Sequence, residues 1–218
     1  MSKKTMGAAA ATLLLAATAY AAPFQNGSFE QPGISGGGDI NTLPAGNTYL
    51  PGWTVTGVNV DYLSTYWQAA DGTHSLDLSG TGAGGVQQTF DTVAGHRYRV
   101  RFALAGNPDG TSNPVKTVVV QATGGTAQTY TFDTTGHSGS NMGWVTETYT
   151  FVATGASATL SFVSQDNSFY GPALDNVAVA DVTPTAVPTL SEWALIGLAG
   201  LLGLFALRGR KLISSLRP

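Results

Sequence analysis

In residues 97–104 every second side chain is large and apolar, and arginine occupies three of the four positions between them. Only an extended strand places every second side chain on the same face, so this segment predicts a strand with one buried face and one wet face. The predicted buried face holds Tyr98, Val100, Phe102 and Leu104. The wet face holds Arg97, Arg99 and Arg101, which form either a solvated surface paired with acids on neighbouring strands or an anion-binding stripe. One buried and one wet face is typical of an antiparallel sheet.

Short segments rich in β-branched and aromatic residues recur along the chain, and turn-forming residues such as Asn107-Pro108-Asp109-Gly110 separate them. Besides 97–104, the predicted strands are 53–55, 58–63, 75–78, 86–90, 115–122, 128–132, 145–152, 159–164 and 174–179. Residues 33–47 are predicted to form a loop. Short strands at this spacing predict an all-β fold, an antiparallel jelly-roll β-sandwich, over residues 22–181.

Charge and cysteine content exclude several classes of partner and site. Charged residues make up 11% of the 218 residues, against about 25% in an average domain. Residues 22–181 carry 12 acidic and four basic side chains, a formal charge of −8. Nucleic acid is therefore not an expected partner, because its phosphates require clustered lysine and arginine. The chain has no cysteine, which excludes disulfides and thiolate metal sites.

The N-terminus has the three parts of a secretory signal peptide over residues 1–21. Lys3 and Lys4 precede an apolar stretch, and Ala19-Tyr20-Ala21 supplies small residues at the cleavage site. The sequence therefore predicts an exported protein.

The C-terminus holds an apolar run over residues 190–207, followed by Arg208, Arg210 and Lys211. A bilayer crossing needs about 20 residues, with roughly 17 as the lower limit. The run is predicted to be a transmembrane helix with its basic tail in the cytoplasm, joined to the sandwich by a linker over 182–189.

The residues in front of that run carry a recognisable motif, Val187, Pro188, Thr189 and Leu190, followed by Trp193. Together with the apolar run and the basic tail, residues 187–218 closely resemble the IPTL-CTERM protein-sorting signal. That resemblance implies processing by an exosortase-type enzyme of a Gram-negative bacterium, after export across the inner membrane to the cell surface or extracellular matrix. A plain membrane anchor through residues 190–207 is the alternative.

Motifs spread over the domain carry a second resemblance. They are Asn26-Gly27-Ser28-Phe29-Glu30, Leu50-Pro51-Gly52-Trp53, Val86-Gln87-Gln88-Thr89-Phe90 and Gly171-Pro172-Ala173-Leu174-Asp175-Asn176-Val177, in that order. They resemble the choice-of-anchor C family of bacterial surface proteins, which is related to a plant cell-wall family and to galactose-binding-like jelly rolls. The resemblance implies an extracellular sandwich suited to carbohydrate binding.

The same resemblance implies a structural calcium site. Glu30 and Asp175 match the carboxylates that bind Ca²⁺ in carbohydrate-binding modules of this architecture, and Gly72 or His74 could add a carbonyl oxygen. Calcium takes 6–8 oxygen ligands. Alternatively, both carboxylates accept hydrogen bonds from the backbone at strand ends. If calcium binds, removing the ion should lower the melting temperature.

Aromatic residues form a candidate sugar-binding surface. Tyr62, Tyr66 and Trp67 are close in sequence, and Tyr170 lies in a late loop beside Phe169. Exposed rings can stack on sugar faces, although core packing is the common alternative for aromatic residues.

Signals of catalysis are weak. His74, His96 and His137 lack zinc-ligand spacing. Asp61, Asp71 and Asp77 are scattered acids for which surface solvation is expected. The sequence therefore predicts an exported, non-catalytic module for extracellular polysaccharide. The alternative is a structural or adhesin-like matrix protein that binds other proteins.

Overall fold

A computed structural model describes residues 22–34, 38–110, 112–184 and 190–214. The chain divides into two units, residues 1–182 and 183–218. The predicted signal peptide lies outside the described residues, as do residues 185–189 of the predicted linker.

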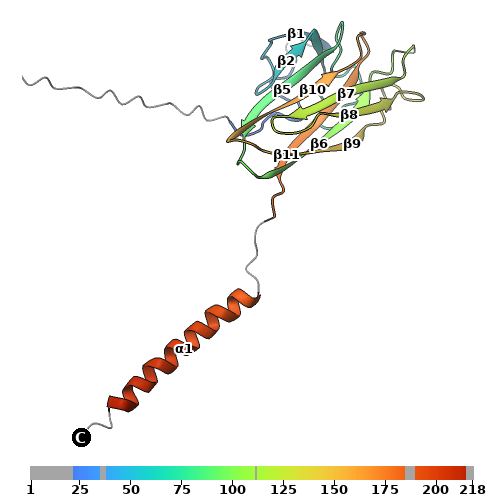
Figure 1. Ribbon diagram of the computed structural model, residues 1–218. Helices are drawn as coiled ribbons and strands as arrows, with labels where there is room; N and C mark the ends of the chain where they lie inside the picture. The colour runs from blue at the N-terminus through green and yellow to red at the C-terminus, as the bar shows by residue number, and fades with distance from the viewer. Residues whose placement is uncertain (1–21, 35–37, 111, 185–189, 215–218) are drawn as a thin grey trace, which may run out of the picture. The chain divides into compact units, whose positions relative to one another are not determined.

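The first unit is a sandwich of two antiparallel sheets (Figure 1). In spatial order, one sheet contains β1 (Ile40–Pro44), β3 (Asn59–Leu63), β4 (Ser75–Asp77), β11 (Pro172–Asp181), β6 (Arg97–Gly106) and β9 (Val145–Val152). The other contains β2 (Thr54–Gly57), β5 (Gly84–Asp91), β10 (Ser157–Ser164), β7 (Val115–Ala122) and β8 (Gln128–Asp133). The predicted all-β, antiparallel jelly-roll class is confirmed.

The core lies between the two sheets and is rich in aromatic rings. Phe102 of β6 packs edge-on against Phe162 of β10, with ring centroids 5.1 Å apart, so the two sheets meet through these side chains. Trp53 is also fully enclosed, and its Nε1 donates to the carbonyl of Asn26 over 2.9 Å. All four predicted apolar residues of β6 are buried, Tyr98, Val100, Phe102 and Leu104. Burial of apolar surface is the main stabilising contribution in such a sandwich.

Every strand predicted from the sequence has a counterpart in the structure, but β1 was missed. Residues 33–47 were predicted to be a loop, and Ile40–Pro44 within them form an edge strand paired with β3. Only Leu43 of this strand is buried, so the segment lacks the apolar alternation that marks a strand. Pro44 is compatible with an edge position, where a missing backbone N–H breaks no central ladder.

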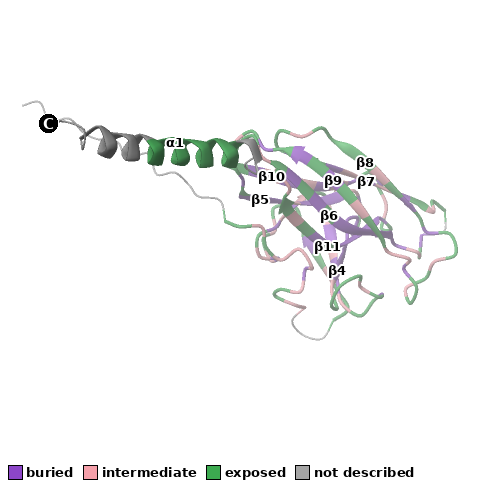
Figure 2. Cartoon of the chain, turned by 90° about the horizontal axis from the view of Figure 1, so that it is seen from below, coloured by how far each residue is buried: buried purple, intermediate pink, exposed green. Residues whose placement is uncertain are grey.

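The outer face of the six-stranded sheet changes character midway along β6 and β11. In β6 the outward-facing Arg97, Arg99 and Arg101 are exposed, whereas every residue from Phe102 to Gly106 is buried. In β11 the residues up to Asp175 are buried and exposed positions begin at Asn176 (Figure 2). We call the outward positions Ala103, Ala105, Ala173 and Asp175 the covered half. The positions Arg99, Arg101, Ala178 and Ala180 are the open half.

The second unit contains the helix α1 (Leu190–Ser214). It begins where the apolar run was predicted to begin, and it continues through the basic residues instead of ending at residue 207. Within the described residues, no helix combines the length and the apolar character that a bilayer crossing requires. The predicted membrane span over 190–207 is therefore not supported.

Candidate functional site

The β3–β4 loop, residues 64–74, contacts the covered half of the sheet at Asp175. Trp67 of this loop is only 4% exposed, and its Nε1 donates to Ser75 Oγ over 2.7 Å. Gln68 links this loop to the segment between β8 and β9, residues 134–144. Its N–H donates to the Gly139 carbonyl and its carbonyl accepts from Trp144 Nε1, both over 2.8 Å. The loop is thus held by contacts distant in sequence.

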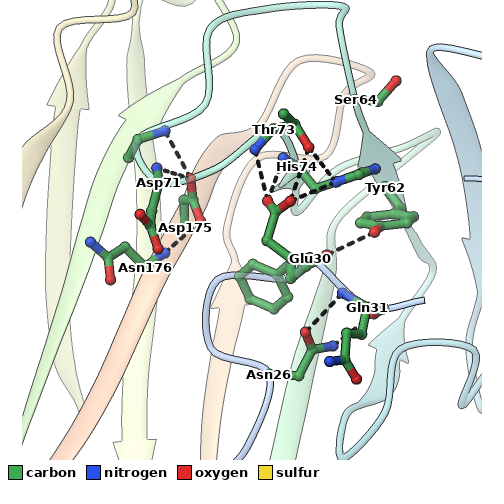
Figure 3. A network of polar contacts seen from close by, with 12 residues as sticks. Asn26, Glu30, Gln31, Tyr62, Ser64, Asp71, Thr73, His74, Asp175 and Asn176 are labelled. Atoms are coloured by element: carbon green, nitrogen blue, oxygen red, sulfur yellow. Dashed lines mark hydrogen bonds and ion pairs between the residues drawn. The ribbon is translucent and has the colours of Figure 1, made fainter. Parts of the chain in front are cut away.

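Asp175 fastens the β3–β4 loop to strand β11 (Figure 3). Its Oδ2 accepts from the N–H groups of Ala70 and Asp71 over 2.8 and 2.9 Å, and its Oδ1 accepts from the N–H of Asn176 over 2.6 Å. The residue is fully buried, and loss of solvation raises the pKa of its carboxyl to about 7.

Glu30 holds the other end of the same loop. It accepts from the N–H groups of Thr73 and His74 over 2.9 and 2.7 Å, and Thr73 Oγ1 donates to its second oxygen over 2.9 Å. Burial raises the pKa of Glu30, but the hydrogen bonds from Thr73 and His74 outweigh it, so the pKa lies below its ordinary value. Gly72 adopts a φ of +65°, and a Cβ there would lie 2.5 Å from the Glu30 carboxyl group. Glycine is the residue that fits this turn.

The structure therefore brings Glu30, Gly72, His74 and Asp175 to one loop, as the predicted calcium site requires. The groups that face the two carboxylates are N–H and O–H donors, however, whereas calcium requires oxygen ligands. Among the described residues, no group of three or more histidine, aspartate or glutamate side chains is placed to hold a metal ion. Calcium binding stays a prediction, and hydrogen bonds to the loop account for both carboxylates without a metal.

Two of the predicted sugar-binding aromatics belong to the core. Tyr62 is fully buried, its hydroxyl donates to the Phe29 carbonyl over 2.7 Å, and its ring stacks on His74. Trp67 is buried beneath its own loop. Protein atoms cover both rings almost completely, so neither offers an open face on which a sugar could stack. Their assignment as an exposed platform is corrected to core packing.

The remaining predicted aromatics, Tyr66 and Tyr170, are exposed, by 44% and 39%. Tyr66 Oη donates to Asp109 Oδ2 over 2.6 Å, which links the β3–β4 loop to the β6–β7 loop. This hydrogen bond, more than burial, raises the pKa of Tyr66 to about 12, so the phenol stays a neutral donor. Tyr170 lies against Gly110, and Phe169 beside it is 61% exposed. The sequence did not indicate the role of Asp109, because it lies 43 residues from Tyr66.

An open groove of about 690 Å³ lies beside Tyr66. Hydroxyl, amide and glycine groups make up most of its lining. The lining residues are Ser64, Thr65, Tyr66, Trp67, Gln68, Ala69, Gly72, Thr73, Gly139 and Ser140. Because Glu30 and Asp175 fix the loop that supplies most of these residues, the groove is shaped before any ligand arrives.

A second buried aspartate positions the neighbouring loops. Asp77 was expected to be solvated, yet it is 1% exposed. It accepts from the N–H groups of Ser79 and Gly171 over 2.8 and 3.1 Å, and from Asn107 Nδ2 over 2.8 Å. Burial raises its pKa to about 7. Asn107 in turn accepts from the N–H of Asp109 over 3.0 Å, so Asp77 supports the loop that holds Tyr66.

The sorting motif falls mostly outside the described residues. Val187, Pro188 and Thr189 are not described, and for Leu190 only the backbone is. Trp193 lies in the first turns of α1 with its side chain 61% exposed.

Comparison with known families matches both parts of the chain. Residues 22–180 match the family described as "Protein of unknown function (DUF642)", and residues 185–211 match the IPTL-CTERM motif. The predicted sorting motif is therefore confirmed. The choice-of-anchor C name is not confirmed, and DUF642 is the family that the comparison supports.

One curated relative is a protein named halomucin, from Haloquadratum walsbyi. It is 33% identical over 175 residues, which make up 77% of this chain but only 2% of halomucin. Among solved structures, TmCBM61 in complex with β-1,4-galactotriose is 17% identical, with a TM-score of 0.47 over 72% of this chain and 97% of that one. A CBM35 from Paenibacillus barcinonensis is also 17% identical, with a TM-score of 0.42 over 64% and 98%.

Proposed function

We propose that this chain, which belongs to the DUF642 family, is an exported, non-catalytic module that binds extracellular polysaccharide. The observation that carries the proposal is the position of Tyr66, an exposed ring at the edge of an open polar groove. The ring offers a flat apolar face for a sugar ring, and the groove offers hydroxyl and amide groups for sugar hydroxyls.

Preorganisation supports the same proposal. The β3–β4 loop is held by two hydrogen bonds to Asp175 and by three to Glu30, from Thr73 and the N–H of His74. Asp109 orients Tyr66. A loop that is already ordered loses little conformational freedom on binding, which favours affinity for a flexible polymer. The two strongly perturbed aspartates, Asp77 and Asp175, are buried and engaged by backbone donors, so they support structure and not acid–base chemistry in the groove.

A glycan screen with the full-length protein tests this function. We expect Tyr66→Ala to weaken binding of the best glycan about tenfold, since an aromatic contact contributes about 0.5–1.5 kcal/mol beyond the area that it buries. Tyr66→Phe keeps the ring and should retain most of the affinity. Val93→Ala, which trims an exposed side chain in the β5–β6 turn, serves as the matched control.

Equal binding by wild type and Tyr66→Ala would move the site elsewhere. Absence of any glycan signal, together with specific capture of a protein partner, would favour the alternative of an adhesin-like matrix protein.

We further propose that an exosortase-type enzyme of a Gram-negative bacterium recognises residues 187–193 and directs the protein to the cell surface. The match of residues 185–211 to the IPTL-CTERM motif supports this step. The mass of the mature protein should then correspond to cleavage within the tail, and replacing residues 187–190 by alanine should leave the tail attached. An intact tail on the wild-type protein at the surface would refute processing.

A further inference from the structure

The exposed cations of the sandwich lie together on a domain that is otherwise acidic. Of the four basic residues within 22–181, Lys116 is 1% exposed, and its Nζ donates to the carbonyl of Asn113. The other three, Arg97, Arg99 and Arg101, occupy alternate positions of β6 and are all exposed. In the described part of the sandwich, every exposed lysine or arginine therefore lies in one row on one face.

The strands beside this row place only short side chains next to Arg99 and Arg101. Arg99 pairs with Thr150 of β9 and Ala180 of β11, and Arg101 pairs with Thr148 and Ala178. The acids that were expected opposite the arginines are absent from these pairs, and the short threonine and alanine side chains do not cover them. Alternate residues of a strand are about 7 Å apart, so the two charges form a row along the sheet.

A hollow adjoins Arg101 at the boundary with the covered half. The register of β11 shifts between Asp175 and Ala178, and Asn176 adopts a φ of +47° and is exposed. The hollow has a volume of about 310 Å³ and is lined by Arg101, Phe102, Ala103, Thr146, Asn176 and Ala178. An arginine fork, an amide and a hydroxyl are groups that donate hydrogen bonds to a carboxylate or sulfate.

We propose that the open half is a second binding site, which takes the anionic groups of an acidic polysaccharide through Arg99 and Arg101. This inference rests on the proposed polysaccharide-binding function and specifies the chemical class of the polymer. The formal charge of −8 over residues 22–181 repels a polyanion from the rest of the domain, so charge complementarity confines the polymer to this face. Arginine suits the role because its planar fork binds carboxylate or sulfate bidentately.

Dextran sulfate and uncharged dextran test the inference, because they share a backbone and differ only in charge. We expect the full-length protein to bind dextran sulfate more tightly than dextran, with an affinity that falls as salt is raised. Arg99→Gln together with Arg101→Gln should weaken dextran sulfate binding about tenfold, since each exposed ionic contact contributes up to about 1 kcal/mol. The matched control, Gln121→Glu with Thr131→Glu, makes the same change in net charge on the exposed outer face of the other sheet and should have little effect.

Equal loss in the double-arginine variant and the control would reduce the effect to net charge and overturn the site. Equal affinity for dextran sulfate and dextran would overturn it as well. Polyglutamate binding as tight as dextran sulfate at equal charge would contradict the assignment to a polysaccharide. Tyr66→Ala should leave salt-dependent dextran sulfate binding intact, which separates failure of this site from failure of the groove.

Discussion

The open half and the covered half of the six-stranded sheet differ in side-chain size, charge and exposure, although both lie on the same face of β6 and β11. In the open half, outward side chains are long and charged, and solvent reaches them. In the covered half, Ala103 and Ala105 replace arginine at the outward positions of β6, and both are buried. The comparison shows that an antiparallel sheet can present a wet face and a buried face on the same side, depending on what a loop covers.

Two features of the covered half explain why the loop lies there. Alanine side chains leave room for a loop to approach the strand, which arginine would not. Asp175 then supplies a buried carboxylate that accepts the N–H groups of Ala70 and Asp71, so the loop satisfies a buried acceptor of the sheet. These hydrogen bonds fix the loop on the sheet. The outer side of the loop lines the groove beside Tyr66.

The largest expected effect comes from extending the arginine row into the covered half. Ala105→Arg places a long cation in the covered half, at a position that is 0% exposed and lies opposite the buried Ala173. Overpacking and burial of a charge should lower the free energy of unfolding by about 3 kcal/mol or more. Chemical denaturation measures this.

The matched control lies four residues away in the same strand. Arg101→Ala removes an exposed side chain and should change the stability by less than about 0.5 kcal/mol. Similar stability of the Ala105→Arg variant and the wild type would mean that the segments over the covered half are displaced easily and do not pack tightly on the sheet.

A smaller effect should be a pH dependence of the free energy of unfolding, caused by the buried Asp77 and Asp175. Burial raises the folded-state pKa of Asp77 and Asp175 from an ordinary value of 3.8 to about 7. Between pH 5 and 7 the folded state then binds more protons than the unfolded state, so stability falls as pH rises. We expect a loss of about 1 kcal/mol or more per aspartate over this range.

The variant Asp175→Asn should flatten the slope of unfolding free energy against pH over this window. Asp91→Asn, at an exposed position at the end of β5, is the control and should keep the slope. Glu30 has a lowered pKa and loses its stabilising effect only as the pH falls through that value, so a window starting at pH 5 limits its interference. A free energy of unfolding that rises from pH 5 to 7 would contradict the raised pKa of Asp77 and Asp175 in the folded state.

The sequence predicted the strands and several residues of the site, but not the long-range hydrogen bonds that join them. The alternation in β6 predicted its inner face, because a two-residue period is a local property. Burial of Asp77 and Asp175 could not be predicted, since it depends on loops that are up to 105 residues away along the chain. The motif that carries Glu30 and Asp175 drew attention to both residues. Only the hydrogen bonds to Thr73, His74, Ala70 and Asp71 showed that they act on one loop.

The sequence by itself determined the fold class, the acidic charge and the sorting motif, because alternation, composition and short motifs are local or additive properties of a chain. The tertiary structure alone decided which aromatics reach solvent. Tyr62 and Trp67 are enclosed while Tyr66, between them in sequence and Trp67's neighbour, is exposed. The reason is physical: exposure depends on the loop path, and long-range hydrogen bonds from Asp175, Glu30 and Asp109 fix that path.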